Sequence, residues 1–343
     1  MTNNTKDNGV PTLADVALHA NVSTATVSRC LNSPERVGEK TRQRVMKAVQ
    51  DLGYAPNFGA QALAARQTNT IAAVIPTMEN AVFARGLQAF QEELGRHGKT
   101  LLVASSAYDA DLEEQQVRAL AARGADGILL IGYDRAPDIY AFLAKQQIPT
   151  LIAWSFNPEE TRPSVGFNNR AAMTELARQV IGHGHKHIAC VSAPTASNDR
   201  ARERVEGIRD AMSQVGQSSS DLVVVETPYG IETGERAFRQ VMTESPRTTA
   251  VMCVNDVLAV GALRAAREMG IKVPDDVSVT GFDDIEIATL AEPPLTTVHV
   301  PHREMGRCAA DMLIHILRGD QDGHTLELAT EIRVRQSLGP APN

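Results

Sequence analysis

Apolar and polar positions recur with a helical period near the start of the chain. Thr12 followed by Asp15 is a capping-box pattern ahead of an apolar face, and it predicts a first helix over residues 13–20. A turn at residues 21–23 leads to a second helix over residues 24–31. Apolar residues recur again over residues 39–52, and Gly53 stands where a C-terminal cap is expected. The pattern therefore predicts three short helices within residues 12–52.

From Thr70 the pattern changes to short β-branched runs that alternate with amphipathic helical stretches. The first expected strands are IAAVIP, TLLVAS, GILLIG and PTLIAW, and after Asn168 they are HIACVSA, LVVVET, TAVMCVN and VSVTGFDD. Apolar strands between helices predict parallel sheets that are covered on both faces, in two doubly wound lobes. Ligands of such sheets bind at the carboxyl ends of the strands.

This reading divides the chain into four parts. We expect a disordered tail over residues 1–9, an all-α unit of short helices over residues 10–55, a hinge helix or linker over residues 56–69, and an α/β core over residues 70–340. Within the core, the N-terminal lobe is expected to comprise residues 70–166 and 297–325, and the C-terminal lobe residues 167–296 and 326–340. The hinge is too short to form a stable helix alone in water, so it would need a partner.

Charge is distributed unevenly along these parts. The net charge of −7 argues against a nucleic-acid partner if it is taken alone. Residues 1–66, however, hold 8 Lys and Arg against 5 Asp and Glu, whereas the remainder holds 26 against 36. Four scattered cysteines, a polar N-terminus and no long apolar run predict a cytoplasmic protein without a membrane segment. The small basic part is the N-terminal one.

The second predicted helix turns a small, polar and basic face outward, with Thr24, Ala25, Ser28 and Arg29 on it. Two short helices joined by a turn are typical of a recognition helix that enters the DNA major groove. An ordinary three-helix domain has the same spacing, so both interpretations remain open at this point.

Longer motifs carry a resemblance to a known family. The runs TLADVALHANVSTATVSRCLN and VGEKTRQRVMKAVQDLGYAPN resemble the N-terminal signature of the LacI/GalR regulators. The resemblance continues in order through GHKHIACVSAP, VNDVLAVGALRA, VSVTGFDDIEIA and PPLTTVHVP, and so spans nearly the whole chain. It implies a helix-turn-helix headpiece joined by a hinge to an effector-binding core like that of periplasmic binding proteins.

The resemblance also implies DNA contacts. Thr24, Ala25 and Arg29 fall where base edges are read, and Arg29 suits a bidentate contact with guanine. Leu63 falls where the family inserts a leucine into the central minor-groove step, although Gln61 replaces a common basic residue there. The other expected DNA contacts, for which capping or solvent exposure is the alternative, are Thr12, Ser23, Thr26, Ser28, Asn32 and Asn57.

By the same resemblance, Arg202 and Asp283 align with residues that hold effector hydroxyl or carboxylate groups, and Asn255 with a further polar contact. The other expected effector contacts are Asn198 and the aromatic residues Phe83, Trp154 and Tyr229, and the aromatic residues could also be core or rim. The carboxylate of Asp256 has an alternative role as a helix N-cap, and Asp284 is similarly ambiguous.

The sequence gives little support for a metal site, an enzyme or a periplasmic binding protein. Residues 183–187 contain three histidines, but alternate residues of a strand point to opposite faces, so a metal site is not favoured. Residues 320–323 lack the ligand spacing of a calcium loop. The absence of phosphate-loop, dinucleotide and nucleophile-elbow motifs argues against an enzyme, and we expect no cofactor. A periplasmic sugar-binding protein is the rival class, and the headpiece argues against it.

The sequence thus predicts a repressor that binds a pseudo-palindromic operator as a homodimer, because one recognition helix buries too little surface for useful specificity. We expect a sugar or sugar acid in the cleft between the lobes to control binding, with release from DNA as the favoured outcome. Such a protein would lie in the bacterial cytoplasm, at the nucleoid when bound to its operator.

Overall fold

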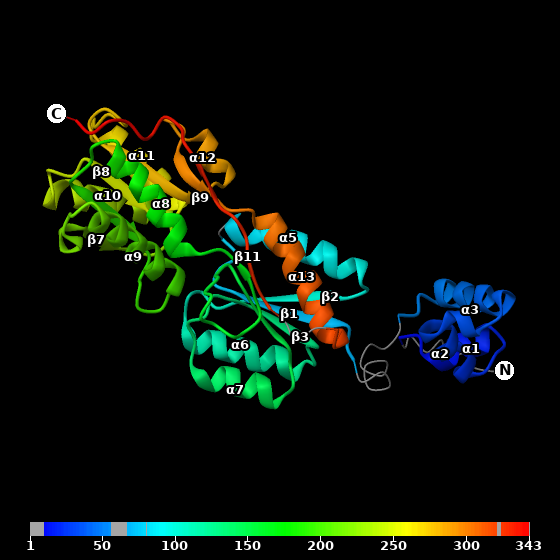
Figure 1. Cartoon of the computed structure of the whole chain (residues 1–343). Helices are drawn as coiled ribbons and strands as arrows, with labels where there is room; N and C mark the ends of the chain where they lie inside the picture. Colours follow the sequence, from blue (N-terminus) through cyan, green and yellow to red (C-terminus); the bar gives the residue numbers. More distant parts are fainter. Residues whose placement is uncertain (1–9, 56–66, 80, 321–323, 343) are drawn as a thin grey trace. The chain divides into compact units, whose positions relative to one another are not determined.

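The computed structural model describes residues 10–55, 67–79, 81–320 and 324–342. It divides into two compact units, Met1–Thr68 and Asn69–Asn343, which we describe separately. We call the first unit the headpiece and the second the core (Figure 1). The expected tail over residues 1–9 and nearly all of the expected hinge lie outside the described residues.

The described residues of the headpiece form three α-helices and one short 3-10 helix. Val16, Val27 and Val45, one from each α-helix, are fully buried against one another and form its small core. The elements are α1 (Leu13–His19), α2 (Thr24–Asn32), η1 (Pro34–Arg36) and α3 (Glu39–Leu52). The three helices that the sequence predicts are therefore present.

Capping interactions fix the start of α1 and the end of α3. The Thr12 side chain accepts a hydrogen bond from the Asp15 backbone N–H at 3.3 Å, and the Asp15 carboxylate accepts one from the Thr12 backbone N–H at 2.8 Å. This reciprocal pair is the expected capping box. Gly53 ends α3 with φ +62°, a left-handed conformation that suits glycine.

The core has two lobes, each built around a six-stranded sheet (Figure 1). In the N-lobe the strand order is β11-β5-β4-β3-β1-β2, and in the C-lobe it is β12-β10-β9-β8-β6-β7. The N-lobe elements are β1 (Thr70–Ile75), α5 (Ala81–Arg96), β2 (Thr100–Ser105), α6 (Ala110–Ala122), β3 (Gly127–Ile131), α7 (Pro137–Lys145), β4 (Thr150–Ala153), β5 (Ser164–Gly166), α13 (His302–Arg318) and β11 (Thr325–Glu327).

In the C-lobe, the helices that cover the sheet pack in pairs, α8 against α9 and α10 against α11. Its elements are α8 (Asn169–Gly182), β6 (Ile188–Ser192), α9 (Asp199–Gln214), η2 (Ser219–Asp221), β7 (Val223–Glu226), α10 (Ile231–Glu244), β8 (Ala250–Cys253), α11 (Asp256–Glu268), β9 (Ser278–Asp283), α12 (Glu286–Leu290), β10 (Thr296–His299) and β12 (Glu331–Arg333).

The chain crosses between the lobes three times, and two crossings differ from those expected. Strand β10 pairs with β9, so the C-lobe continues past the expected boundary at residue 297, and the crossing follows His299. Strand β11 pairs with β5 in the N-lobe through Glu327, beyond the expected boundary at residue 325. Both boundaries fall inside strands of only three or four residues, whose apolar pattern is too short to show their partner.

Parallel pairing holds throughout except at one edge, where β12 runs antiparallel to β10. All eight strands expected from the sequence are present in their expected order. The short strands β5, β10, β11 and β12 were not expected, because a run of three or four residues carries little periodicity.

Candidate functional sites

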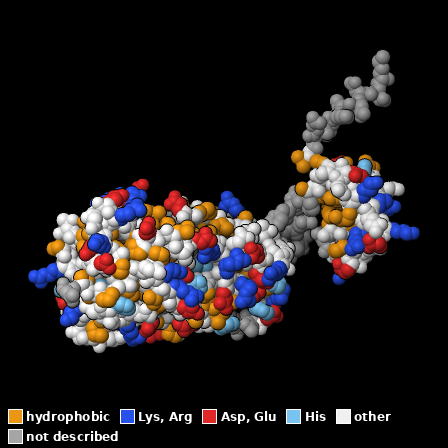
Figure 2. All heavy atoms as spheres, turned by 90° about the horizontal axis from the view of Figure 1, so that it is seen from above, with side chains coloured by type: hydrophobic (Ala, Val, Ile, Leu, Met, Phe, Trp, Pro, Cys, Tyr) orange, Lys and Arg blue, Asp and Glu red, His pale blue; other side chains and the backbone are white. Residues whose placement is uncertain are grey.

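The outward face of α2 carries three of the residues predicted to contact DNA bases. Thr24, Ala25 and Arg29 are exposed, whereas Val27 and Cys30 on the opposite face are buried. Lys and Arg side chains lie on the headpiece surface seen in Figure 2, with apolar side chains among them. The exposed face of α2 itself carries the positive charge of Arg29.

Of the remaining predicted DNA contacts, some are described by the structure and others lie outside it. Ser23 is the N-cap of α2: its hydroxyl accepts from the Thr26 backbone N–H at 3.2 Å and lies 2.9 Å from the Thr26 hydroxyl. Thr12 belongs to the capping box of α1, and Ser28 is half-buried. Residues Asn57 and Leu63, the Gln61 substitution and the side chain of Asn32 lie outside what the structure describes.

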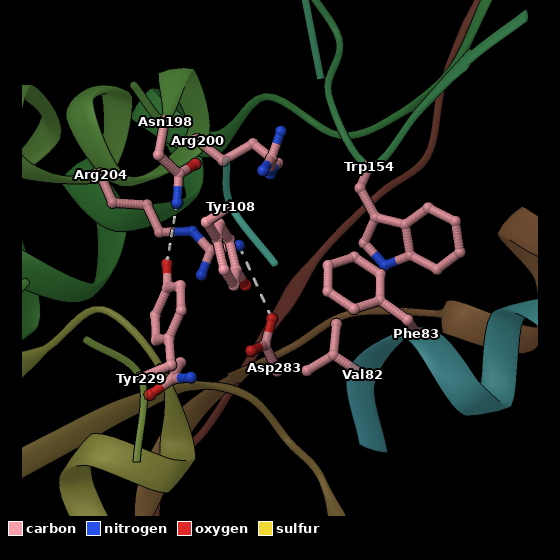
Figure 3. A pocket seen from close by; sticks show the side chains of 10 residues that line it. Val82, Phe83, Tyr108, Trp154, Asn198, Arg200, Arg204, Tyr229 and Asp283 are labelled. Atoms are coloured by element: carbon pink, nitrogen blue, oxygen red, sulfur yellow. Dashed lines mark hydrogen bonds and ion pairs between the residues drawn. The ribbon is translucent and has the colours of Figure 1, made fainter. Parts of the chain in front are cut away.

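A pocket in the core lies between the two lobes and is drawn in Figure 3. The N-lobe contributes the start of α5 and the residues that follow β2 and β4. The C-lobe contributes the start of α9, the residue before α11, the end of β9 and the loop before α10. The lining residues are Val82, Phe83, Tyr108, Trp154, Asn198, Arg200, Arg204, Tyr229, Asn255 and Asp283. We call this space the inner pocket.

Arg204 is the most firmly held polar group of the inner pocket. Its Nε donates to Asn169 Oδ1 at 2.8 Å and its Nη1 to the Val254 carbonyl at 2.6 Å. The guanidinium lies over the Phe282 ring at 3.8 Å from the ring centre. Its remaining nitrogen, Nη2, lies 3.6 Å from Asp283 Oδ1, so one nitrogen and one carboxylate face the pocket together.

Asp283 is buried at the end of β9 with φ +108°, which is uncommon for a residue with a side chain. Burial raises the pKa of its carboxyl group to about 7, although Arg204 and Arg200 act in the opposite direction. Among the described residues, Asp283 Oδ1 and Asn255 Nδ2 are buried without a hydrogen-bond partner. Asp283 Oδ1 is thus ion-paired with Arg204 but accepts no hydrogen bond, and the Asn255 amide donates none, so a polar ligand could complete both groups.

The N-lobe side of the pocket is aromatic. Trp154, fully buried and with φ +61°, has its ring centre 5.4 Å from that of Phe83, edge to face. Its indole Nε1–H donates to His302 Nδ1 at 3.3 Å. Burial lowers the pKa of His302 to about 3, so this imidazole stays neutral and accepts the bond. The tryptophan is therefore held in one orientation beside the polar groups.

Hydrogen bonds join the two lobes beside the inner pocket. Asp199 Oδ2 accepts from the Tyr133 backbone N–H at 2.6 Å, and Arg200 Nη1 donates to the Ile131 carbonyl at 3.0 Å. Arg200 also pairs with Asp199 at 2.8 Å. The start of α9 therefore seats on the loop that follows β3.

Six of the seven predicted effector contacts line the inner pocket: Phe83, Trp154, Asn198, Tyr229, Asn255 and Asp283. Arg202 does not, since it pairs with Asp134 at 2.8 Å and donates to the Thr195 carbonyl. Successive residues of a helix are 100° apart, so Arg200 and Arg204 share a face of α9 that Arg202 does not. The four-residue spacing of Arg200 and Arg204 in the sequence is the signal that would have identified both as pocket residues. Tyr108 and Val82 were also missed, and the sequence offered no such signal for them.

The ambiguous aspartates have other partners. Asn255, and not Asp256, is the N-cap of α11, because its Oδ1 accepts from the Leu258 N–H at 2.9 Å. The Asp256 carboxylate instead accepts from the Ile285 N–H at 2.8 Å and the Thr297 hydroxyl at 2.6 Å. Asp284 pairs with Arg335 and His299. These groups hold the C-lobe together and do not line the inner pocket.

The histidines at residues 183–187 follow α8 and do not lie in a strand. His185 is fully buried, with Nδ1 2.9 Å from the Thr249 hydroxyl and Nε2 3.0 Å from the Gly339 carbonyl. Both ring nitrogens are therefore occupied by protein groups. No described helix combines the length and apolar character that a membrane crossing requires.

Comparison with known proteins adds independent information. A family model described as bacterial regulatory proteins of the lacI family matches residues 12–57, and a periplasmic binding protein-like domain matches residues 177–338. The transcriptional repressor CytR of Escherichia coli (strain K12) is 31% identical over 339 residues, which cover 98% of this chain and 99% of CytR. The chain belongs to the LacI family. It is a DNA-binding transcriptional repressor of that family, and its relatives are regulators and not enzymes.

Other members of the LacI family agree with this assignment. The regulator DegA of Bacillus subtilis (strain 168) is 34% identical over 334 residues, covering 96% of this chain and 98% of DegA. A LacI-family regulator from Silicibacter pomeroyi has a TM-score of 0.87 at 26% identity and covers 96% of this chain and 99% of its own. The lac repressor dimer bound to operator and an anti-inducer has a TM-score of 0.85 at 26% identity, covering 96% and 100%.

Proposed function

We propose that this repressor binds a pseudo-palindromic operator as a homodimer, with one headpiece on each half-site. The exposed face of α2, with Thr24, Ala25 and Arg29, supports major-groove reading, and the solved lac repressor complex is a dimer on its operator. The insertion of Leu63 at the centre of the operator, by a hinge over residues 56–69, remains a prediction from the sequence.

We further propose that a sugar or sugar acid occupies the inner pocket and controls DNA binding. The observation that carries this proposal is the pair of unsatisfied buried atoms, Asp283 Oδ1 and Asn255 Nδ2, beside Arg204 Nη2. A hydroxyl group donates to one neighbour and accepts from another, so neighbouring hydroxyls of a sugar would satisfy all three groups. The aromatic wall of Trp154 and Phe83 suits the apolar face of a sugar ring.

A neutral sugar is favoured over a sugar acid. Arg200 is paired with Asp199, and Arg204 faces Asp283, so each arginine of the pocket has a carboxylate of its own. A carboxylate ligand would have to compete with Asp283 for Arg204. One structural relative, the regulator CelR at 29% identity and TM-score 0.71, was solved as a complex with cellobiose. We expect the ligand to release the repressor from DNA, and the cytoplasmic location remains a prediction.

The first experiment is fluorescence anisotropy of the repressor on DNA from upstream of its own gene, at fixed salt, with pools of sugars, sugar acids and purines. A pool that releases wild-type protein should fail to release the Asp283→Asn variant, while both proteins bind DNA equally without ligand. The Asp320→Asn variant, changed at an exposed turn, is the matched control and should respond like wild type. If no sugar pool changes DNA binding, the proposed ligand class is wrong.

A further inference from the structure

The amino edge of the N-lobe sheet carries three linked polar residues. Asn69, Lys99 and Asp126 stand directly before β1, β2 and β3 respectively, and β1 lies between the other two strands. The Lys99 Nζ donates to Asn69 Oδ1 at 3.0 Å and to Asp126 Oδ2 at 3.2 Å. One ammonium group therefore ties together the starts of three parallel strands. We call these three residues the edge cluster.

The ion pair within the edge cluster is nearly buried. The side chains of Lys99 and Asp126 are only 12% and 10% exposed. Replacing a buried ion pair by apolar residues of similar volume is often neutral for stability, because taking both charges out of water costs about as much as their attraction returns. The pair is thus a poor source of stability. What it does provide is a fixed geometry, since hydrogen bonds between charged groups are short and directional.

Asn69 is the first residue of the core, and the chain continues from it through Thr68 to the headpiece. It is exposed and has φ +54°, a left-handed conformation that asparagine tolerates better than most residues. Its backbone carbonyl accepts from the Thr100 N–H at 2.8 Å, and its side chain accepts from Lys99. Both the backbone and the side chain of Asn69 therefore fix the direction in which the chain leaves the core.

We propose that Lys99 is a positioning residue for DNA binding, which holds Asn69 so that the chain leaves the core in one direction. Its ammonium group is occupied by two oxygen atoms, so Lys99 acts through Asn69 and not as a phosphate contact. A repressor that binds two half-sites must hold two headpieces at a fixed spacing, and any freedom where the chain leaves the core is lost on binding. The inference rests on the proposed binding of an operator by a homodimer.

Fluorescence anisotropy on the duplex that the wild-type repressor selects from a random DNA pool tests the proposal. Asn69→Gly permits the left-handed backbone and removes the side-chain acceptor, so we expect binding to weaken about fivefold or more. Asn69→Asp restores an acceptor for Lys99 and should bind like wild type. Gln147→Gly is the matched control, because Gln147 is an exposed N-lobe residue with φ +55° outside the edge cluster. Equal affinities of Asn69→Gly and Gln147→Gly would overturn the proposal.

The salt dependence of binding separates positioning from direct contact with DNA. The double variant Lys99→Met/Asp126→Asn leaves the net charge unchanged. It should bind as weakly as Asn69→Gly, with the same salt dependence as wild type. A shallower salt dependence would mean that Lys99 contacts a phosphate, and this result would contradict the positioning role.

A half-site duplex, in which one half of the selected sequence is scrambled, distinguishes this inference from the proposed homodimer. All variants should bind the half-site equally, because a single headpiece requires no fixed spacing. A loss of the same size on the half-site would show a general structural defect and would overturn the positioning role. If the wild-type protein binds the half-site as tightly as the full duplex, the proposed homodimer fails first, and the role of Lys99 fails with it.

Discussion

Asp283 is the residue on which the chemistry of the pocket depends most. Its carboxyl group is buried, and burial outweighs the attraction of Arg204 and Arg200, so its pKa is raised from 3.8 to about 7. Because the folded state holds this proton more tightly than the unfolded state, the ionised carboxylate lowers the stability of the unliganded protein as pH rises from about 4 towards 7. Ligand binding should therefore be coupled to this proton.

The direction of that coupling identifies the ligand class. A neutral sugar donates a hydroxyl hydrogen to the ionised carboxylate, so its affinity should rise as the pH increases through 7. A sugar acid would favour the protonated form, and its affinity should fall over the same range. Titrations followed by Trp154 fluorescence at several pH values measure the trend. The Asp283→Asn variant should flatten it, and a trend that persists in this variant must come from another group.

Arg29 is predicted to read one base pair. The Arg29→Ala variant should lose about 1–3 kcal/mol of operator binding and tolerate any base at one operator position. The measurement is binding to a set of operators that carry single base changes, at constant salt. Lys47→Ala on α3 removes the same charge at another exposed position and should weaken binding to all sequences alike. An equally uniform loss in Arg29→Ala would contradict base reading.

Among the helices and strands, those whose apolar pattern extends over many residues could be predicted from the sequence, and the shortest strands could not. Eight strands and the three headpiece helices follow from periodicity, and six predicted effector contacts converge because parallel strands bring their carboxyl ends to one edge. Arg202 does not line the inner pocket, because the helical spacing of α9 places Arg200 and Arg204 on the pocket face and Arg202 on another. Tyr108 could not be predicted, since its place depends on how a loop folds against the opposite lobe.

Gly132 lies where the loop after β3 closely approaches the start of α9. It follows β3 with φ +71°, and a Cβ there would collide with the Arg200 guanidinium and the Asp199 carboxylate. Gly132→Ala should therefore keep α9 from seating on this loop and weaken ligand binding about tenfold or more, as measured by calorimetry. Gly98→Ala is the matched control, because Gly98 has φ +67° with no atom within 4 Å of its Cβ. Equal effects of the two variants would trace the loss to backbone strain alone.

At the scale of the whole molecule, the proposed regulation couples two units of the chain. If ligand binding lowers operator affinity by some factor, operator binding must lower ligand affinity by the same factor. We expect calorimetry of the ligand to give a correspondingly weaker Kd when the repressor is saturated with operator than when it is free. Saturation with DNA of unrelated sequence is the control. Unchanged ligand affinity on the operator would mean that the pocket does not regulate DNA binding.

The crossing of the chain between lobes has a consequence for the order in which the protein forms during synthesis. Strand β11 completes the N-lobe sheet and β12 completes the C-lobe sheet, and both come from residues 325–333. The headpiece, by contrast, lies within the first 68 residues. A nascent chain can therefore fold its DNA-binding unit early, whereas neither lobe has all its strands until residues 325–333 have left the ribosome. In the life of each molecule, the unit that contacts DNA would fold before the unit that is controlled by ligand.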